Sequence, residues 1–72
     1  MTRTPTPKEV GRKVRAARIK AGFKAQDVAA RAAGLHPNTL GDIESGRRYP
    51  RFIQVVQMHR AWNTNPGDIL AA

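Results

Sequence analysis

A chain of 72 residues with no cysteine allows one small domain, and it excludes both a disulfide framework and a thiolate metal site. Thirteen lysines and arginines stand against five acidic residues, so the net charge is +8, which favours a polyanionic partner such as nucleic acid over a merely basic surface. No apolar run approaches the roughly 20 residues of a membrane span and no apolar signal region opens the chain, so a cytoplasmic, nucleoid-associated protein is expected.

The first predicted helix spans residues 8–21. Residues 1–7 are rich in threonine and proline and are predicted to form a disordered arm before it. From residue 8 onward, apolar residues recur at helical spacing on one stripe: Val10, Val14, Ala17 and Ala21. Gly22 suits the position after the last helical turn. Ile19 falls opposite the stripe, and nothing within a monomer explains it.

The second predicted helix, residues 25–33, has high helix propensity but small side chains, which let a neighbouring helix approach closely. Phe23, just before it, is expected to anchor the core, and Gly34 supplies the following turn. The third predicted helix spans residues 37–45, and Gly46 ends it.

Several residues mark the start of this third helix. His36 takes the cap position, as a weaker cap than serine or aspartate, and Pro37 takes the first helical position. Leu35 and Leu40 have the spacing of a hydrophobic staple. Leu40, Ile43 and the stem of Glu44 are expected to face inward.

The fourth predicted helix spans residues 52–62, with one apolar stripe: Phe52, Val55, Val56, His59 and Trp62. Within this stripe, His59 is expected to be packed rather than a ligand, and Trp62 to be core rather than a base-stacking platform. A short last helix follows, predicted from a cap, a first-turn proline and a first-turn acid: Asn65, Pro66 and Asp68. Ile69 and Leu70 would close the core. The expected fold is all-α, a compact five-helix bundle over residues 8–72.

A helix, a glycine turn and a second helix in the middle of the chain predict a helix-turn-helix. When the third helix is projected at 100° per residue, Asn38, Asp42 and Ser45 point outward, with Thr39 and Gly41 on the flanks. Short polar side chains let a helix sit deep in the major groove, where asparagine pairs with adenine, threonine contacts thymine and aspartate accepts from cytosine. Three arginines follow and are interpreted as a phosphate clamp rather than as helix-dipole partners: Arg47, Arg48 and Arg51.

Residues 10–70 resemble the Cro/CI-type (Xre-type) helix-turn-helix family of phage repressors and bacterial regulators. The most specific match is the I-E-x-G-x-x-x-P pattern, here Ile43, Glu44, Gly46 and Pro50. The resemblance implies a lambda-repressor-like DNA-binding domain in which Arg18 forms a structural ion pair with Glu44. It also implies two-fold dimers on a double-stranded DNA operator, with the third helix in the major groove.

Three departures from the family pattern bear on the site. The interval from Gly22 to Gly34 is one residue longer than usual, so the buried pair of the second helix is either Val28 and Ala29 or Ala29 and Ala30. Val28 offers more apolar surface, which favours the first register. The resemblance implies a glutamine in the first turn of the second helix that contacts phosphate and base. In the favoured register Ala25 matches that position, and Gln26 falls one place late. Ser45 is a further candidate for a phosphate contact.

The other two departures lie on the third helix. Pro37 stands where the family often has a glutamine that reads a base. Proline cannot read a base by hydrogen bond, but it can touch a thymine methyl group. Asp42 is an acid where many relatives have a neutral or basic residue.

No enzyme motif is present, and the spacing of the two histidines excludes a metal site. The sequence therefore predicts a non-enzyme without cofactor, metal, small-molecule substrate or membrane partner. We expect a sequence-specific DNA-binding transcriptional regulator, a phage or bacterial repressor, which forms a homodimer before or upon DNA binding. The alternative is a small antitoxin or anti-repressor that acts by protein–protein binding, with exposed Ile19 as its hint. The chain is either a complete regulator or the DNA-binding part of a longer one.

Overall fold

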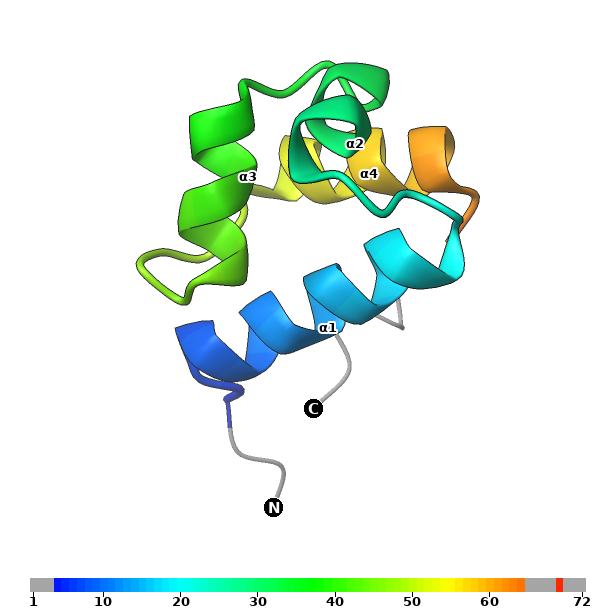
Figure 1. Ribbon diagram of the computed structural model, residues 1–72. Helices are drawn as coiled ribbons and strands as arrows, with labels where there is room; N and C mark the ends of the chain where they lie inside the picture. Colours follow the sequence, from blue (N-terminus) through cyan, green and yellow to red (C-terminus); the bar gives the residue numbers. More distant parts are fainter. Residues whose placement is uncertain (1–3, 65–68, 70–72) are drawn as a thin grey trace.

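The computed structural model describes residues 4–64 and residue 69. Its four helices are α1 (Pro7–Lys20), α2 (Gln26–Ala32), α3 (Pro37–Glu44) and α4 (Phe52–Trp62), and α3 packs against both α1 and α2 (Figure 1). No strand occurs in this part of the chain. The all-helical fold is confirmed, but the described residues support four helices rather than five. The predicted last helix falls on residues 65–70, of which only Ile69 is described; its side chain is buried, as expected.

A capping box starts α1 at Pro7, one residue earlier than predicted. The backbone N–H of Glu9 donates to Oγ1 of Thr6 at 3.2 Å, and the backbone N–H of Thr6 donates to Oε1 of Glu9 at 3.1 Å. The Tyr49 hydroxyl also donates to the carbonyl oxygen of Pro5 at 2.7 Å. Residues 5–7 are therefore tied to the domain, although the sequence predicts a disordered arm over residues 1–7.

The core is built from one stripe of each helix and includes Trp62. The indole Nε1 of Trp62 donates to the carbonyl oxygen of Ala29 at 3.1 Å, and its ring lies tilted against that of Phe23 with centroids 6.5 Å apart. Phe23 is thus partly buried against the core, and Trp62 is fully part of it. The largest fully buried side chains are Leu40, Ile43, Met58, Ile69, Val14 and Val55.

The preferred register of α2 was wrong. Val28 is 53% exposed, whereas Ala29 and Ala30 are completely buried. The extra residue lies before α2: Ala25 is extended and caps the helix, which begins at Gln26. Val28 offers the greater apolar surface, but the turn before α2 places the start of the helix so that Ala29 and Ala30 face the core instead.

The apolar stripe of α4 also differs from the prediction. Val55, Met58 and Trp62 are buried, whereas Phe52 is 77% exposed. Val56 and His59 are only partly buried. The inward face therefore follows a spacing of three and four residues through Met58, and Phe52 at the first position of the helix lies off that face.

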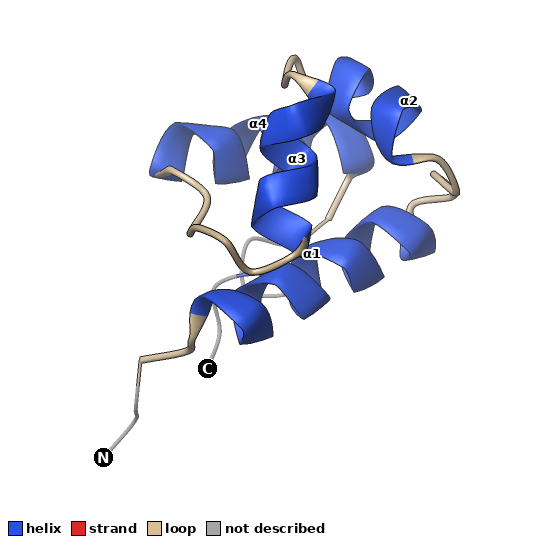
Figure 2. Ribbon diagram, turned by 60° about the vertical axis from the view of Figure 1, so that its left-hand side comes forward, coloured by secondary structure: helices blue, strands red, loops and turns tan. Residues whose placement is uncertain are grey.

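A buried glycine sets how α1 meets α3. A Cβ atom at Gly11 would lie 2.5 Å from the carbonyl oxygen of Ile43 and 2.7 Å from that of Glu44. The backbone of α1 therefore touches the last turn of α3, and Figure 2 shows that end of α3 meeting α1. This contact fixes the direction in which the outer face of α3 points.

Candidate nucleic-acid interface

The first turn of α3 is held in place by its cap. Nδ1 of His36 accepts the backbone N–H of Asn38 at 3.1 Å, which confirms His36 as the cap residue. Leu35 and Leu40 are both buried, in agreement with the predicted hydrophobic staple. Pro37 occupies the first helical turn, and Asn38 is exposed beside it. Asn38 therefore projects from a rigid backbone.

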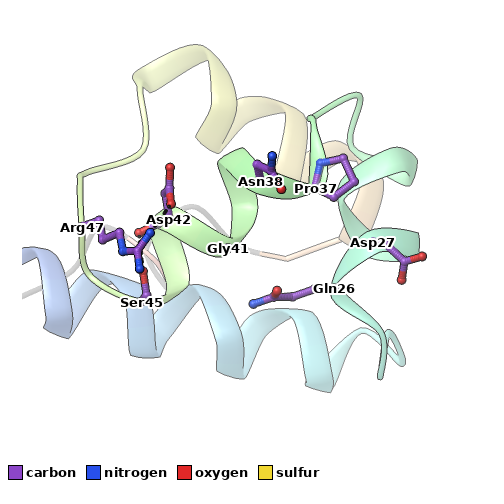
Figure 3. Close-up of a pocket in the computed structure, with 8 residues that line it drawn as sticks. All are labelled: Gln26, Asp27, Pro37, Asn38, Gly41, Asp42, Ser45 and Arg47. Atoms are coloured by element: carbon purple, nitrogen blue, oxygen red, sulfur yellow. Dashed lines mark hydrogen bonds and ion pairs between the residues drawn. The ribbon is translucent and has the colours of Figure 1, made fainter.

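The outer face of α3 borders an open hollow shared with α2 (Figure 3). Residues from the first turn of α2, from α3 and from the loop after it line this hollow: Gln26, Asp27, Pro37, Asn38, Gly41, Asp42, Ser45 and Arg47. Gly41 leaves the space open, since a Cβ atom there would meet only Oε1 of Gln26, at 3.7 Å. The hollow thus brings together side chains from three segments of the chain.

The hollow contains some of the predicted contact residues but not all of them. Thr39 lies outside its lining, because it sits on the flank of α3 opposite Gly41, away from α2. Arg48 and Arg51 also lie outside it and are exposed. Neither arginine forms an ion pair with another residue in the described ranges. Their charges are thus available to a partner.

Arg18 and Glu44 form a buried ion pair between α1 and the end of α3. The Nε of Arg18 donates to Oε2 of Glu44 at 2.8 Å, and Nη2 donates to Oε1 at 3.2 Å. The two side chains are only 6% and 4% exposed. Nη1 donates as well to the carbonyl oxygens of Phe23 and Lys24, at 2.8 and 2.7 Å. Arg18 therefore joins α1, the turn before α2 and α3, a wider role than the family resemblance implied.

Gln26 is joined to the same ion pair. Its Nε2 donates to Oε1 of Glu44 at 3.1 Å, although Gln26 itself is exposed. Since α2 begins at Gln26, this residue lies in the first turn, at the position that the family pattern gives to a contact glutamine. In the register that the sequence favoured, Gln26 fell one residue after that position.

Asp27, next to Gln26, also lines the hollow and was not among the predicted contact residues. The signal that the sequence offered for Asp27 is its place as the acidic residue in the first turn of α2, where the helix dipole favours a negative charge.

Asp42 has a partner that the sequence did not suggest. Nη1 of Arg47 lies 3.5 Å from Oδ1 of Asp42, in an exposed ion pair whose arginine side chain is 78% exposed and whose aspartate side chain is 38% exposed. The backbone N–H of Arg47 donates to the carbonyl oxygen of Asp42 at 3.0 Å, and the Ser45 hydroxyl donates to that same oxygen at 3.1 Å. Figure 3 shows the Arg47 side chain folded toward Asp42 along α3.

Within residues 4–64 and 69, no three histidine, cysteine or acidic side chains gather as metal ligands would. None of the helices described is both long and apolar enough to cross a bilayer.

Residues 9–72 match the model of the helix-turn-helix domain family. The fold is similar to that of the restriction-modification controller protein C.AhdI from Aeromonas hydrophila, with a TM-score of 0.80, 22% identity, and coverage of 89% of this chain and 96% of that chain. It is also similar to the hypothetical transcription factor NHTF from Neisseria, with a TM-score of 0.75, 19% identity, and coverage of 97% and 84%. No curated protein sequence matches the chain. With nearly its whole length matched by the family model, the chain belongs to the helix-turn-helix domain family of Xre/Cro type, a class of non-enzymatic DNA-binding regulators.

Proposed function

We propose that this protein is a transcriptional repressor of phage or bacterial origin that binds operator DNA with α3 in the major groove. One observation carries the proposal: the polar hollow between α2 and α3 is followed along the chain by two exposed arginines, Arg48 and Arg51, that have no ion pair in the described part of the chain. In specific DNA recognition, polar side chains contact base edges and determine sequence preference, while cationic side chains contact phosphates and position the protein.

Base reading is assigned to the outer face of α3. Asn38 is exposed on a capped helix turn, and asparagine forms a bidentate pair with adenine. Pro37 lines the hollow and offers an apolar contact to a thymine methyl group. Thr39 lies on the outer flank, where its hydroxyl or methyl group would meet a neighbouring base pair, and Asp42 would accept from a cytosine amino group.

Phosphate contacts are assigned to residues around the hollow. Arg48 and Arg51 follow α3 and carry unpaired charges within the described ranges. Gln26 uses one N–H of its amide on Glu44, so its second N–H is free to donate to a phosphate oxygen. Ser45 is exposed at the end of α3, and its hydroxyl can rotate from the carbonyl oxygen of Asp42 to a phosphate.

Two alanine variants test this assignment in a binding titration against operator and random duplexes. Arg48→Ala should weaken binding to every duplex and reduce the slope of log K against log salt by about one, because one phosphate contact is lost. Asn38→Ala should mainly erode the preference for operator, by about five- to 150-fold, the range for one bidentate base contact. Direct reading by α3 is excluded if the two variants behave alike on every sequence.

We further propose that two copies bind together on half-sites about one helical turn, roughly 34 Å, apart. Phe52 is 77% exposed and Ile53 is 60% exposed, adjacent at the start of α4 and directly after the phosphate-contact loop. Two large apolar side chains at this place suit contact with a second copy bound to the same duplex face.

The oligomer prediction has a matched control within the chain. Phe52→Ser should lower cooperative binding to a two-half-site duplex while leaving the affinity for a single half-site nearly unchanged, because it adds no charge next to the phosphate contacts. Ile19→Ser, which changes a side chain that is 51% exposed on α1, should leave both affinities unchanged. If Ile19→Ser alone disrupts assembly, the apolar residue of α1 is the protein-binding surface, as the antitoxin or anti-repressor alternative requires.

A further inference from the structure

We propose that Arg47 reads a guanine in the major groove and that Asp42 is its positioning residue. This inference rests on the proposed function and deepens it, since it moves Arg47 from the phosphate contacts to the residues that determine sequence preference. It starts from the exposed ion pair between these two side chains.

The backbone of Arg47 is fixed against α3. Gly46 turns the chain with a φ of +82°, and a Cβ atom there would lie 2.9 Å from Cα of Lys8, so no other residue fits. After this turn the N–H of Arg47 donates to the carbonyl oxygen of Asp42 at 3.0 Å. Arg47 therefore leaves a rigid turn in a defined direction, back along the outer face of α3.

The location of the pair distinguishes Arg47 from the other two arginines. Arg47 and Asp42 both line the hollow, and Asn38 lies one helical turn before Asp42 on the same face (Figure 3). Arg48 and Arg51 do not line it. If α3 occupies the groove, the Arg47 guanidinium lies among the base-reading side chains, whereas Arg48 and Arg51 lie beside them.

The charge of the pair also favours a base over a phosphate. The carboxylate of Asp42 offsets the charge of Arg47 and would repel a phosphate brought to the same place, so the pair adds little attraction to the DNA backbone. Guanine presents two acceptors, O6 and N7, that match the fork of a guanidinium. Arg47 uses one N–H toward Asp42 and keeps others for this fork. The remaining capacity of Asp42 suits the amino group of a cytosine.

The test is a binding titration with an operator duplex and a set of duplexes that each change one base pair. Arg47→Ala should abolish the preference for one G·C pair, a loss of about five- to 150-fold in discrimination at that position and little at others. Arg47→Lys should keep the affinity for random DNA but lose most of this preference, because lysine has the charge without the fork. Arg48→Ala is the matched control and should weaken all duplexes evenly.

Asp42 is tested through its coupling to Arg47. Asp42→Asn should weaken the preference at the same G·C pair, and at that pair the double variant Asp42→Asn/Arg47→Ala should lose no more discrimination than Arg47→Ala alone. Asp42→Ala should bind random DNA more tightly, because Arg47 is then free to bind phosphate. If Asp42→Ala instead binds random DNA more weakly, the assigned positioning role is overturned.

The outcomes separate this inference from the proposed function. If the unaltered protein binds every duplex equally, the proposed function itself fails. If it discriminates, but Arg47→Ala weakens all duplexes evenly and lowers the salt slope by about one, then Arg47 is a phosphate contact. In that case only the present inference is overturned. Circular dichroism spectra of each variant should match that of the unaltered protein, since both side chains are largely or partly exposed.

Discussion

The Glu44→Ala variant is expected to be largely unfolded at 25 °C. Removing the carboxylate leaves the guanidinium of Arg18 buried and unpaired, with its side chain only 6% exposed. Breaking a buried ion pair by removing one partner costs about 3–5 kcal/mol, which is comparable to the whole stability that a core of this size supplies. Circular dichroism at 222 nm and thermal melting measure the effect directly.

The exposed ion pair of the same helix provides the control. Asp42→Ala removes an acid whose partner, Arg47, is 78% exposed, so the free energy of unfolding should change by about 0–1 kcal/mol. Glu44→Gln should fall between the two, because it keeps an acceptor for Arg18 but removes the charge. A Glu44→Ala protein that melts within a few degrees of Asp42→Ala would show that the buried pair does not hold α1 and α3 together.

Gly11→Ala is expected to destabilise the protein by about 1–3 kcal/mol or more, because the added methyl group overlaps two backbone carbonyl oxygens of α3. Backbone atoms in a helix turn cannot move aside as a flexible side chain does, so α1 must shift away from α3. In a domain of this size each kcal/mol lowers the melting temperature by roughly 4–8 °C.

Gly41→Ala is the opposite case and makes a sharp comparison. Its new Cβ atom would make only an ordinary contact with Gln26, at 3.7 Å, and alanine is favoured over glycine in a helix by about 0.5–1 kcal/mol. Gly41→Ala should therefore raise the melting temperature while Gly11→Ala lowers it. Equal effects from both would mean that intrinsic helix propensity, rather than the contact between α1 and α3, governs Gly11.

The sequence predicted those features that depend on neighbours along the chain. The cap and staple of α3 follow from local signals at His36, Leu35 and Leu40, and the structure has both. The helix boundaries agree to within one residue or so, because glycine and proline mark them. The inward stripe of α1 was also predicted, since the opposite face is mostly basic, with Ile19 as the exception.

Features that depend on contacts between distant segments were predicted poorly. Val28 was preferred for the core because of its size, yet the turn held by Arg18 and the close approach of Trp62 bury alanines instead. Gly11 carried no signal, since the carbonyl oxygens that require it lie more than thirty residues away in the sequence. The pairing of Asp42 with Arg47 was also missed, because it spans the left-handed turn at Gly46 rather than one helical repeat.

The shared carboxylate of Glu44 has a consequence for how such a protein can change its target. Loss of Gln26 would remove one of the donors to Glu44, yet Arg18 would still satisfy both carboxylate oxygens. The side chains assigned to base reading are exposed or partly exposed and contribute little to the core. Under the proposed function, single substitutions of these side chains would change the operator preference with little effect on the fold, while Arg18 and Glu44 remain fixed. The carboxylate of Glu44 contacts Arg18, which stabilises the fold, and Gln26, which is proposed to contact phosphate. A substitution of Gln26 therefore need not disturb the ion pair that stabilises the fold.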